Sequence, residues 1–392
     1  MQENRLYRFL VITFLGSFAV ISIERAIYFL TAERLGFSPV ANLWLALAFG
    51  VAYVSGALAS HGVASRGGER RVLWAVLVIQ AAVHLGLGVW PVGVAIFIGC
   101  SVAGFLYGMQ WPIIESYVGA GHSATQGHRA VGMFNLSWAL AIPLTLVVAG
   151  IVIRYSPRLL FWIPAILNVV MLILLRRVPA SPARLDHDHP ERPSTQQIQQ
   201  LQRLLIGHRW LLLTSYIAMF VLAPLLPGVF ARLGLPVSSA TAWSGSLDVL
   251  RVMAFLLLWL FSGWHGKRWP VWASALLLPM GFFLALFGPT LSWVIAGEAV
   301  FGATTGVVYF GALHYALVVS NATVDAGGAH EGLIGAGFAI GPLVGLMSIG
   351  LAPRVGGELA ASLLVLGPIF GLGGWLAIRS LRGMSAPGGG PH

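Results

Sequence analysis

The chain has 392 residues, of which 57% are hydrophobic and only 9% are charged, and its formal net charge is +10. So few polar residues could not cover the surface of a water-soluble domain of this length. The composition therefore predicts an integral membrane protein. Nucleic-acid binding is not expected, because the sequence has no basic face with interleaved aromatic residues outside the membrane.

Apolar runs recur along the chain, and each is long enough to cross about 30 Å of hydrocarbon as a helix. They differ from the alternating ten-residue segments of a membrane β-barrel. We therefore predict an all-α membrane protein with twelve transmembrane helices, near residues 9–31, 40–60, 72–90, 92–118, 131–153, 158–175, 210–231, 239–263, 270–288, 290–320, 332–352 and 358–378.

The cations between these runs predict the orientation, because Lys and Arg collect in cytoplasmic loops. With the N-terminus inside, 16 of the 23 cations lie on the cytoplasmic side, 5 lie in outer loops, and Arg25 and Arg251 lie within helices. Both termini are thus expected in the cytoplasm. Arg outnumbers Lys 22 to 1, which is typical of a GC-rich bacterial genome and indicates the bacterial inner membrane.

Residues 176–209 interrupt the apolar rhythm with Pro, Gln and charged residues. This segment predicts a cytoplasmic linker between a six-helix bundle at 1–175 and a second bundle at 210–392 that ends in a short tail. Its Asp186, His187, Asp188 and His189 have no second ligand pair at a fixed spacing, so we predict no metal site.

The two halves repeat each other. "ERLGFSP" at 33–39 recurs as "ARLGLPV" at 231–237, so Gly36 corresponds to Gly234. At the same offset "SRGGERR" at 65–71 corresponds to "GWHGKRW" at 263–269, which aligns Gly68 with Gly266. Because the matched motifs follow one another in the same order at a constant offset, the sequence predicts two pseudo-symmetric bundles.

The first predicted helix carries Glu24 and Arg25 side by side. An ionisable side chain that faces lipid costs between about 3 and more than 10 kcal/mol, so such residues usually face a bundle interior or a wet cavity. On a continuous helix Tyr28 lies one turn from Glu24, whereas Glu24 and Arg25 differ by about 100°. Arg25 is therefore expected to reach an acid on another helix or a bound anion.

Helix 92–118 places Tyr107, Trp111 and Glu115 on one stripe. Glu115 either faces the bundle interior or extends into water at the cytoplasmic end. In helix 131–153, Asn135 and Trp138 share a face. The two tryptophans either stack on a ligand or pack against neighbouring helices.

Helix 239–263 carries Asp248 and Arg251 three residues apart, which forms either a structural ion pair or part of a binding site. Helix 290–320 carries Glu298 in its outer half, where it forms a gate, a helix-end contact or a contact with the substrate. It also carries His314, which either relays protons or is bonded to a neighbouring helix.

Six plus six helices, a basic central loop and the paired short loops resemble the major facilitator superfamily over nearly the whole chain. That family carries Gly-x-x-x-Asp-Arg-x-Gly after helices 2 and 8. Here the first loop keeps Arg66, Gly68 and Arg70 with Ser65 in place of the Asp, and the second keeps Gly266, Lys267 and Arg268. The resemblance implies a gating role for these loops, and a central cavity lined by helices 1, 4, 7 and 10 with parts of 2, 5, 8 and 11.

A secondary transporter that works by alternating access is therefore expected, a monomer moving a small anionic or zwitterionic solute with protons. The substrate-binding candidates are Arg25, Tyr28, Tyr107, Trp111, Asn135, Trp138, Arg251 and His314, and the proton-coupling candidates are Glu24, Glu115 and Asp248. The many aromatic residues favour a second interpretation, proton-driven efflux of amphipathic compounds. A third interpretation is a membrane-embedded transferase with Glu24, Asp248 and His314 as its catalytic groups. No nucleotide-binding loop is present, so no cofactor is expected.

Overall fold

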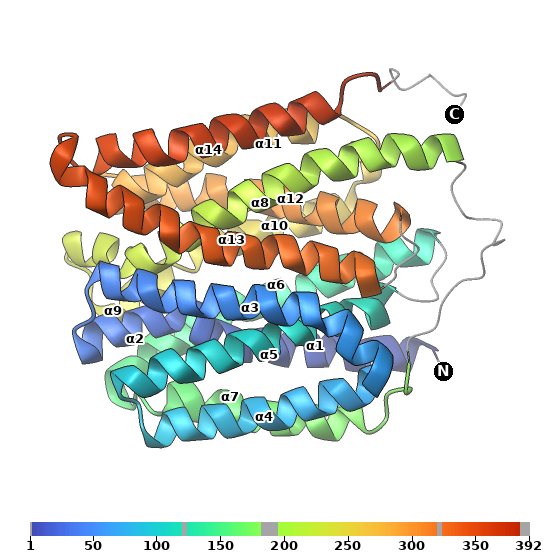
Figure 1. Ribbon diagram of the computed structural model, residues 1–392, viewed down its shortest axis with the longest axis horizontal. Helices are drawn as coiled ribbons and strands as arrows, with labels where there is room; N and C mark the ends of the chain where they lie inside the picture. The colour runs from blue at the N-terminus through green and yellow to red at the C-terminus, as the bar shows by residue number, and fades with distance from the viewer. Residues whose placement is uncertain (1, 120–123, 182–194, 320–323, 385–392) are drawn as a thin grey trace.

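The computed structural model describes residues 2–119, 124–181, 195–319 and 324–384, which form helices and no strand (Figure 1). The first half of the chain contains α1 (Gln2–Glu24), α2 (Ala26–Leu35), α3 (Pro39–Gly67), α4 (Glu69–Val89), α5 (Gly93–Gly119), α6 (Ala124–Tyr155) and α7 (Leu159–Leu175). The second half contains α8 (Thr195–Arg232), α9 (Val237–Trp243), α10 (Ser246–Leu260), η1 (Ser262–Trp264), α11 (Trp269–Phe287), α12 (Leu291–Val319), α13 (Val324–Leu351), η2 (Ala352–Arg354) and α14 (Glu358–Ser380).

These helices form the twelve predicted spans. In the described residues eleven helical segments are long and apolar enough to cross a membrane, when α1 with α2 and α9 with α10 are each taken as one segment. The twelfth, Leu159–Leu175, is apolar but shorter. The start of α1 and the end of α14 lie at the same end of the molecule, which we call the termini side (Figure 1).

The first predicted helix is not continuous. It ends at Glu24 and resumes at Ala26, because Arg25 leaves the helical backbone with φ −127° and ψ −54°. The predicted position of Tyr28 one helical turn from Glu24 assumed a continuous helix, and that assumption is wrong. The eighth predicted helix is likewise divided at Ser244 and Gly245. Each break frees backbone groups that an intact helix would pair.

The loops that repeat in the sequence also repeat in the backbone. Gly36 and Gly234 adopt φ 67° and 72°, and Gly68 and Gly266 adopt φ 81° and 68°. Positive φ strains any residue with a Cβ, so glycine is favoured at each position. The matched glycines thus make the same kind of turn in both halves.

The segment predicted as a linker is partly helical. Residues 195–209 belong to α8, which continues through the membrane to Arg232. The Asp186–His189 group lies outside the described residues.

The two halves meet along two pairs of helices that span their whole length. α3 packs against α13, with Leu43 beside Gly345 at one end and Leu58 beside Gly332 at the other. α6 packs in the same way against α9 and α10. A methyl group on Gly132 would overlap Trp259 on the termini side. The halves are therefore closed against each other both above and below the centre.

Candidate functional site

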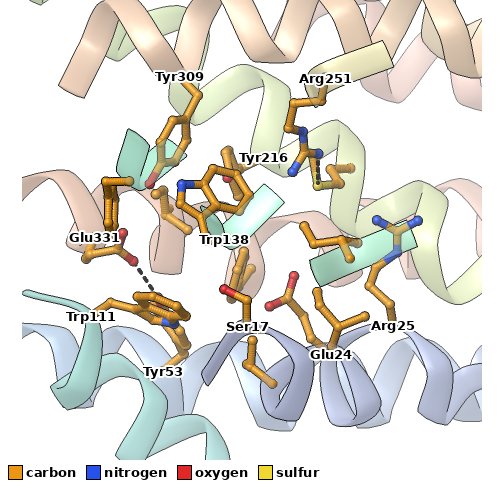
Figure 2. A pocket seen from close by; sticks show the side chains of 17 residues that line it. Ser17, Glu24, Arg25, Tyr53, Trp111, Trp138, Tyr216, Arg251, Tyr309 and Glu331 are labelled. Carbon is orange, nitrogen blue, oxygen red and sulfur yellow. Dashed lines mark hydrogen bonds between the residues drawn. The ribbon is translucent and has the colours of Figure 1, made fainter. Parts of the chain in front are cut away.

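A cavity of about 60 Å³ lies between the halves at the centre of the bundle (Figure 2). That volume holds a few water molecules. Its walls come from α1, α3, α5, α6, α8, α10, α12 and α13, which are the eight spans that the family resemblance implied. The lining residues are Ser17, Val20, Ile21, Glu24, Arg25, Tyr53, Trp111, Phe134, Trp138, Ile142, Tyr216, Met219, Arg251, Tyr309, Glu331, Ile334 and Phe338.

An ion pair across the halves lies at one end of this cavity. Arg25 Nη1 lies 3.3 Å from Asp248 Oδ2, and both side chains are buried. Arg25 Nη2 also donates to the backbone carbonyl of Ser244 at 3.3 Å. That carbonyl is available because the helix is broken at this point, and Asp248 N bonds to Gly245 O instead. The structure thus confirms that Arg25 reaches an acid on another helix.

The same carboxylate also serves a second guanidinium. Arg251 Nη1 lies 3.5 Å from Asp248 Oδ1, so the predicted intrahelical pair forms. Arg251 otherwise contacts the Met219 sulfur at 3.4 Å and lies over the Trp138 ring, 5.8 Å from its centroid. Its Nε has no hydrogen-bond partner among the described residues. A buried guanidinium with an unused donor beside a cavity is suited to an anionic ligand.

Glu24 extends into the cavity on the side of these arginines (Figure 2). It is partly exposed to the cavity, whereas Asp248 is fully buried. Arg25 and Arg251 line the same cavity as Glu24. Glu24 is therefore the acid of this group that a water molecule or ligand in the cavity can reach.

The opposite end of the cavity has a different chemistry. Tyr53 of α3 donates a hydrogen bond to Glu331 Oε2 of α13, which again joins the halves (Figure 2). Glu115 of α5, His330 and Glu331 each place one ligand atom within 4.8 Å of the others. Glu115 is 2% exposed, so it does not extend into water at the helix end in this structure.

Sequence reasoning missed His330 and Glu331. The predicted span begins at 332, but α13 begins at Val324 and includes both residues. The signal available in the sequence was the adjacent His-Glu pair just ahead of an apolar run.

Several predicted site residues lie outside the cavity wall. The Tyr28 hydroxyl is buried and has no partner among the described residues. The Tyr107 hydroxyl lies 3.5 Å from His84 Nε2 within the first half. Asn135 supports the wall from behind, because its Oδ1 accepts from Trp138 Nε1 at 3.1 Å. Trp111 and Trp138 themselves line the cavity.

Two other candidates on α12 lie away from the cavity wall. His314 stacks on His265 beside Trp264, with the imidazole centroids 4.6 Å apart. Glu298 is fully buried and accepts a hydrogen bond from Ser246.

The two short loops are anchored within their own halves. Arg70 Nη1 donates to Val178 O at 2.8 Å, just after α7. Arg268 Nη2 donates to Met384 O, just after α14. These matched arginines bind matched backbone sites, and Gly266 N donates to the Tyr315 hydroxyl. Arg66 and Lys267 are exposed.

Comparison with known proteins agrees with this architecture. The sequence profile described as Major Facilitator Superfamily matches residues 9–345. No curated protein matches significantly. Among solved structures, the human organic anion transporter MFSD10 (TETRAN) is similar with a TM-score of 0.67 at 14% identity, over 96% of this chain and 99% of that one. The nucleoside transporter NupG is similar with a TM-score of 0.65 at 13% identity, over 97% and 100%. A single-residue mutant of NupG gives 0.63 at 14%, over 96% and 99%.

At identities this low, the similarity establishes a shared fold. It does not indicate that this chain carries the cargo of either neighbour. The profile, by contrast, covers most of the chain, and the cavity lies where alternating access requires it. These findings set aside a membrane-embedded transferase. The chain belongs to the major facilitator superfamily and is a secondary transporter, not an enzyme.

Proposed function

We propose that the protein moves a small anionic or zwitterionic solute together with protons. The observation that carries this proposal is the charge arrangement around one end of the cavity. Asp248 pairs with both Arg25 and Arg251, so one carboxylate serves two guanidinium groups. Glu24 is the remaining acid on that side of the cavity wall.

The protonation of Glu24 then controls the binding of an anion. When Glu24 is ionised and Glu298, the buried acid bonded to Ser246, carries its proton, the charges of Glu24 and Asp248 balance the two arginines. When Glu24 takes up a proton, one positive charge is left without a partner in a poorly solvated place. A carboxylate or other anionic group of the solute restores neutrality by binding to Arg251. Proton and anion are thus favoured together, which is the requirement for symport.

Alternating access supplies the movement. With the halves closed at both ends, the structure corresponds to an occluded form of the cycle. The Arg25–Asp248 pair joins the halves on the side away from the termini, because Arg25 follows α1 and Asp248 opens α10. We propose that this pair separates when the cavity opens to that side, and that Asp248 holds the arginines in place without exchanging protons itself.

Efflux of amphipathic compounds is the second candidate. It is supported by the aromatic residues of the cavity wall, which include Trp111, Trp138, Tyr216, Tyr309 and Phe338. An amphipathic cargo would bind to this aromatic surface and depend little on Arg251. Loss of binding in an Arg251 variant therefore separates the two candidates.

The proposed location is the bacterial inner membrane with the termini side in the cytoplasm. The support is the distribution of cations described above together with the common position of the first and last helices in Figure 1. In membrane proteins the cytoplasmic loops carry an excess of Lys and Arg.

Binding measurements on the purified protein test the proposed cargo. A panel of monocarboxylates, dicarboxylates, amino acids and organic cations is titrated while the midpoint of thermal unfolding is followed. We expect at least one acid or amino acid to stabilise the protein, and Arg251→Gln to weaken that binding by about tenfold or more, since a charge-assisted bond is lost.

The matched control for this experiment is Arg379→Gln. Arg379 also lies over a tryptophan ring, that of Trp375, at 4.9 Å from the centroid, but outside the cavity. It should leave binding unchanged. Stabilisation by cations alone, or equal binding in both variants, contradicts an anionic cargo.

A further inference from the structure

The halves are joined at a second place, by carboxyl groups instead of an ion pair. Glu115 lies near the end of α5, and Glu331 lies near the start of α13 in the other half. Both positions are on the termini side of the cavity, opposite to Arg25 and Asp248. One oxygen of each carboxyl lies within 4.8 Å of the other. Glu115 is 2% exposed and Glu331 is 4% exposed, so both carboxyl groups are shielded from bulk water.

In the described residues neither Glu115 nor Glu331 forms an ion pair with an arginine or lysine, and the basic group nearest to them is the imidazole of His330. Tyr53 of α3 donates to Glu331, and neither oxygen of Glu115 has a hydrogen-bond partner at normal geometry among those residues. Two ionised carboxylates at this separation in a poorly solvated site repel each other strongly. The arrangement becomes favourable when one proton lies between them, because one carboxyl can then donate to the other.

The other groups that face the pair do not change this conclusion. The further titratable or charged neighbours are Tyr216 of α8, Tyr309 of α12, His330 on the same helix as Glu331, and Glu24 and Arg251 across the cavity. The tyrosines are neutral. Arg251 is held by Asp248 at the opposite end. The His330 ring lies edge-on to the Tyr309 ring, with centroids 4.9 Å apart.

A divalent metal is the competing occupant, since Glu115, His330 and Glu331 could supply three ligands. Both ring nitrogens of His330 lack a hydrogen-bond partner in the part of the chain that the structure describes. Metal binding, however, needs all three ligand atoms at about 2.0–2.2 Å from one point. It would also compete with the hydrogen bond that Tyr53 donates to Glu331.

We propose that Glu115 and Glu331 share one proton, and that this proton clasps α13 of the second half to α3 and α5 of the first. Loss of the proton leaves two like charges within 4.8 Å of each other and drives the halves apart on the termini side. The clasp deepens the proton-coupled transport proposed above and rests on it. It adds a proton site on the side where Arg25 and Asp248 make no contact. Opening at each side then requires the helix packing between the halves to separate and one polar contact to be released, an ion pair at one end and a shared proton at the other.

Spin labels measure this opening without any substrate. The native chain has a single cysteine, Cys100, so Cys100→Ser gives a clean background. Labels on Val63→Cys and Trp269→Cys lie in opposite halves at exposed positions on the termini side. Between about pH 5.5 and 8.5 we expect the distance distribution to shift from short to long, with the closed-to-open ratio falling up to about tenfold per pH unit, as one proton requires.

Glu115→Gln and Glu331→Gln should each remain closed over the whole range, because an amide donates the bond without a proton. Glu298→Gln removes a buried carboxyl elsewhere in the second half and should keep the wild-type response. A distance that does not depend on pH in the wild type overturns the clasp, as does a wild-type response in either folded Gln variant.

Metal occupancy gives a different result. If Zn²⁺ or Mn²⁺ closes the wild type at high pH, and this closure is lost in His330→Ala, the site is a metal site and the shared proton is wrong. Failure of the clasp is also distinct from failure of the transport proposal. The labels report opening directly, whereas proton-driven flux is measured separately in vesicles.

Discussion

Replacement of Asp248 by asparagine is expected to lower the free energy of unfolding by about 3–5 kcal/mol, the usual cost of removing one partner of a buried ion pair. Asp248 is fully buried and is the acid that pairs with both Arg25 and Arg251. Its neutralisation leaves two guanidinium groups in the interior with no opposing charge at contact distance. Unfolding in mixed micelles, followed by tryptophan fluorescence, measures this loss.

Glu298→Gln is the matched control for that substitution. Glu298 is also fully buried in the second half, but its carboxyl group is hydrogen-bonded to the Ser246 hydroxyl and forms no ion pair among the described residues. Its replacement by an amide should cost about 1 kcal/mol, the value of an ordinary hydrogen bond. Equal losses in the two variants would show that Asp248 does not hold the arginines together.

Gly50→Ala is expected to prevent closure of the halves without destabilising either half. A methyl group at this position on α3 would overlap the backbone carbonyl of Phe338 on α13, which cannot rotate away. Such overpacking costs about 1–3 kcal/mol, so the closed form should be depopulated by about tenfold or more. In the open form alanine favours the helix over glycine. The distance between spin labels on Val63→Cys and Trp269→Cys, which lie in opposite halves, measures the change in the closed population.

Two glycine controls separate closure from folding. Gly350→Ala on α13 has no atom within 4 Å of the new methyl group and should leave the distance distribution unchanged. Gly56→Ala should lower stability, because its methyl group would overlap Phe105 of α5 within the first half. A wild-type distribution in Gly50→Ala would mean that the α3–α13 contact does not control closure.

The spans could be predicted from the sequence because hydrocarbon thickness imposes a long, uniform apolar signal. The helices that line the cavity were implied only by the family resemblance. The repeat at a constant offset placed Gly36 with Gly234 and Gly68 with Gly266, and both pairs adopt positive φ. The position of Arg25 within a membrane helix predicted that it reaches an acid on another helix or a bound anion. The sequence could not identify Asp248 as that partner, because pairing between helices depends on their packing.

Two features of the site had no adequate local signal. The break at Arg25 occurs without Gly or Pro within "VISIERAIYFLT", so helical periodicity continued through it and placed Tyr28 beside Glu24. Glu331 was assigned to the segment before a span, because the apolar window began one residue later. Its contact with Tyr53 and Glu115 arises only from the packing of α13 against the first half.

The account depends most directly on the claim that Glu24 couples a proton to an anion in the central cavity. Flux of radiolabelled carboxylates and amino acids into proteoliposomes, under imposed proton gradients and in parallel under sodium gradients, tests it. The wild type should accumulate an anionic or zwitterionic solute when a proton gradient is imposed, and Glu24→Gln should lose accumulation while still binding and exchanging that solute. Undiminished proton-driven accumulation in Glu24→Gln, or accumulation that follows sodium alone, would contradict it.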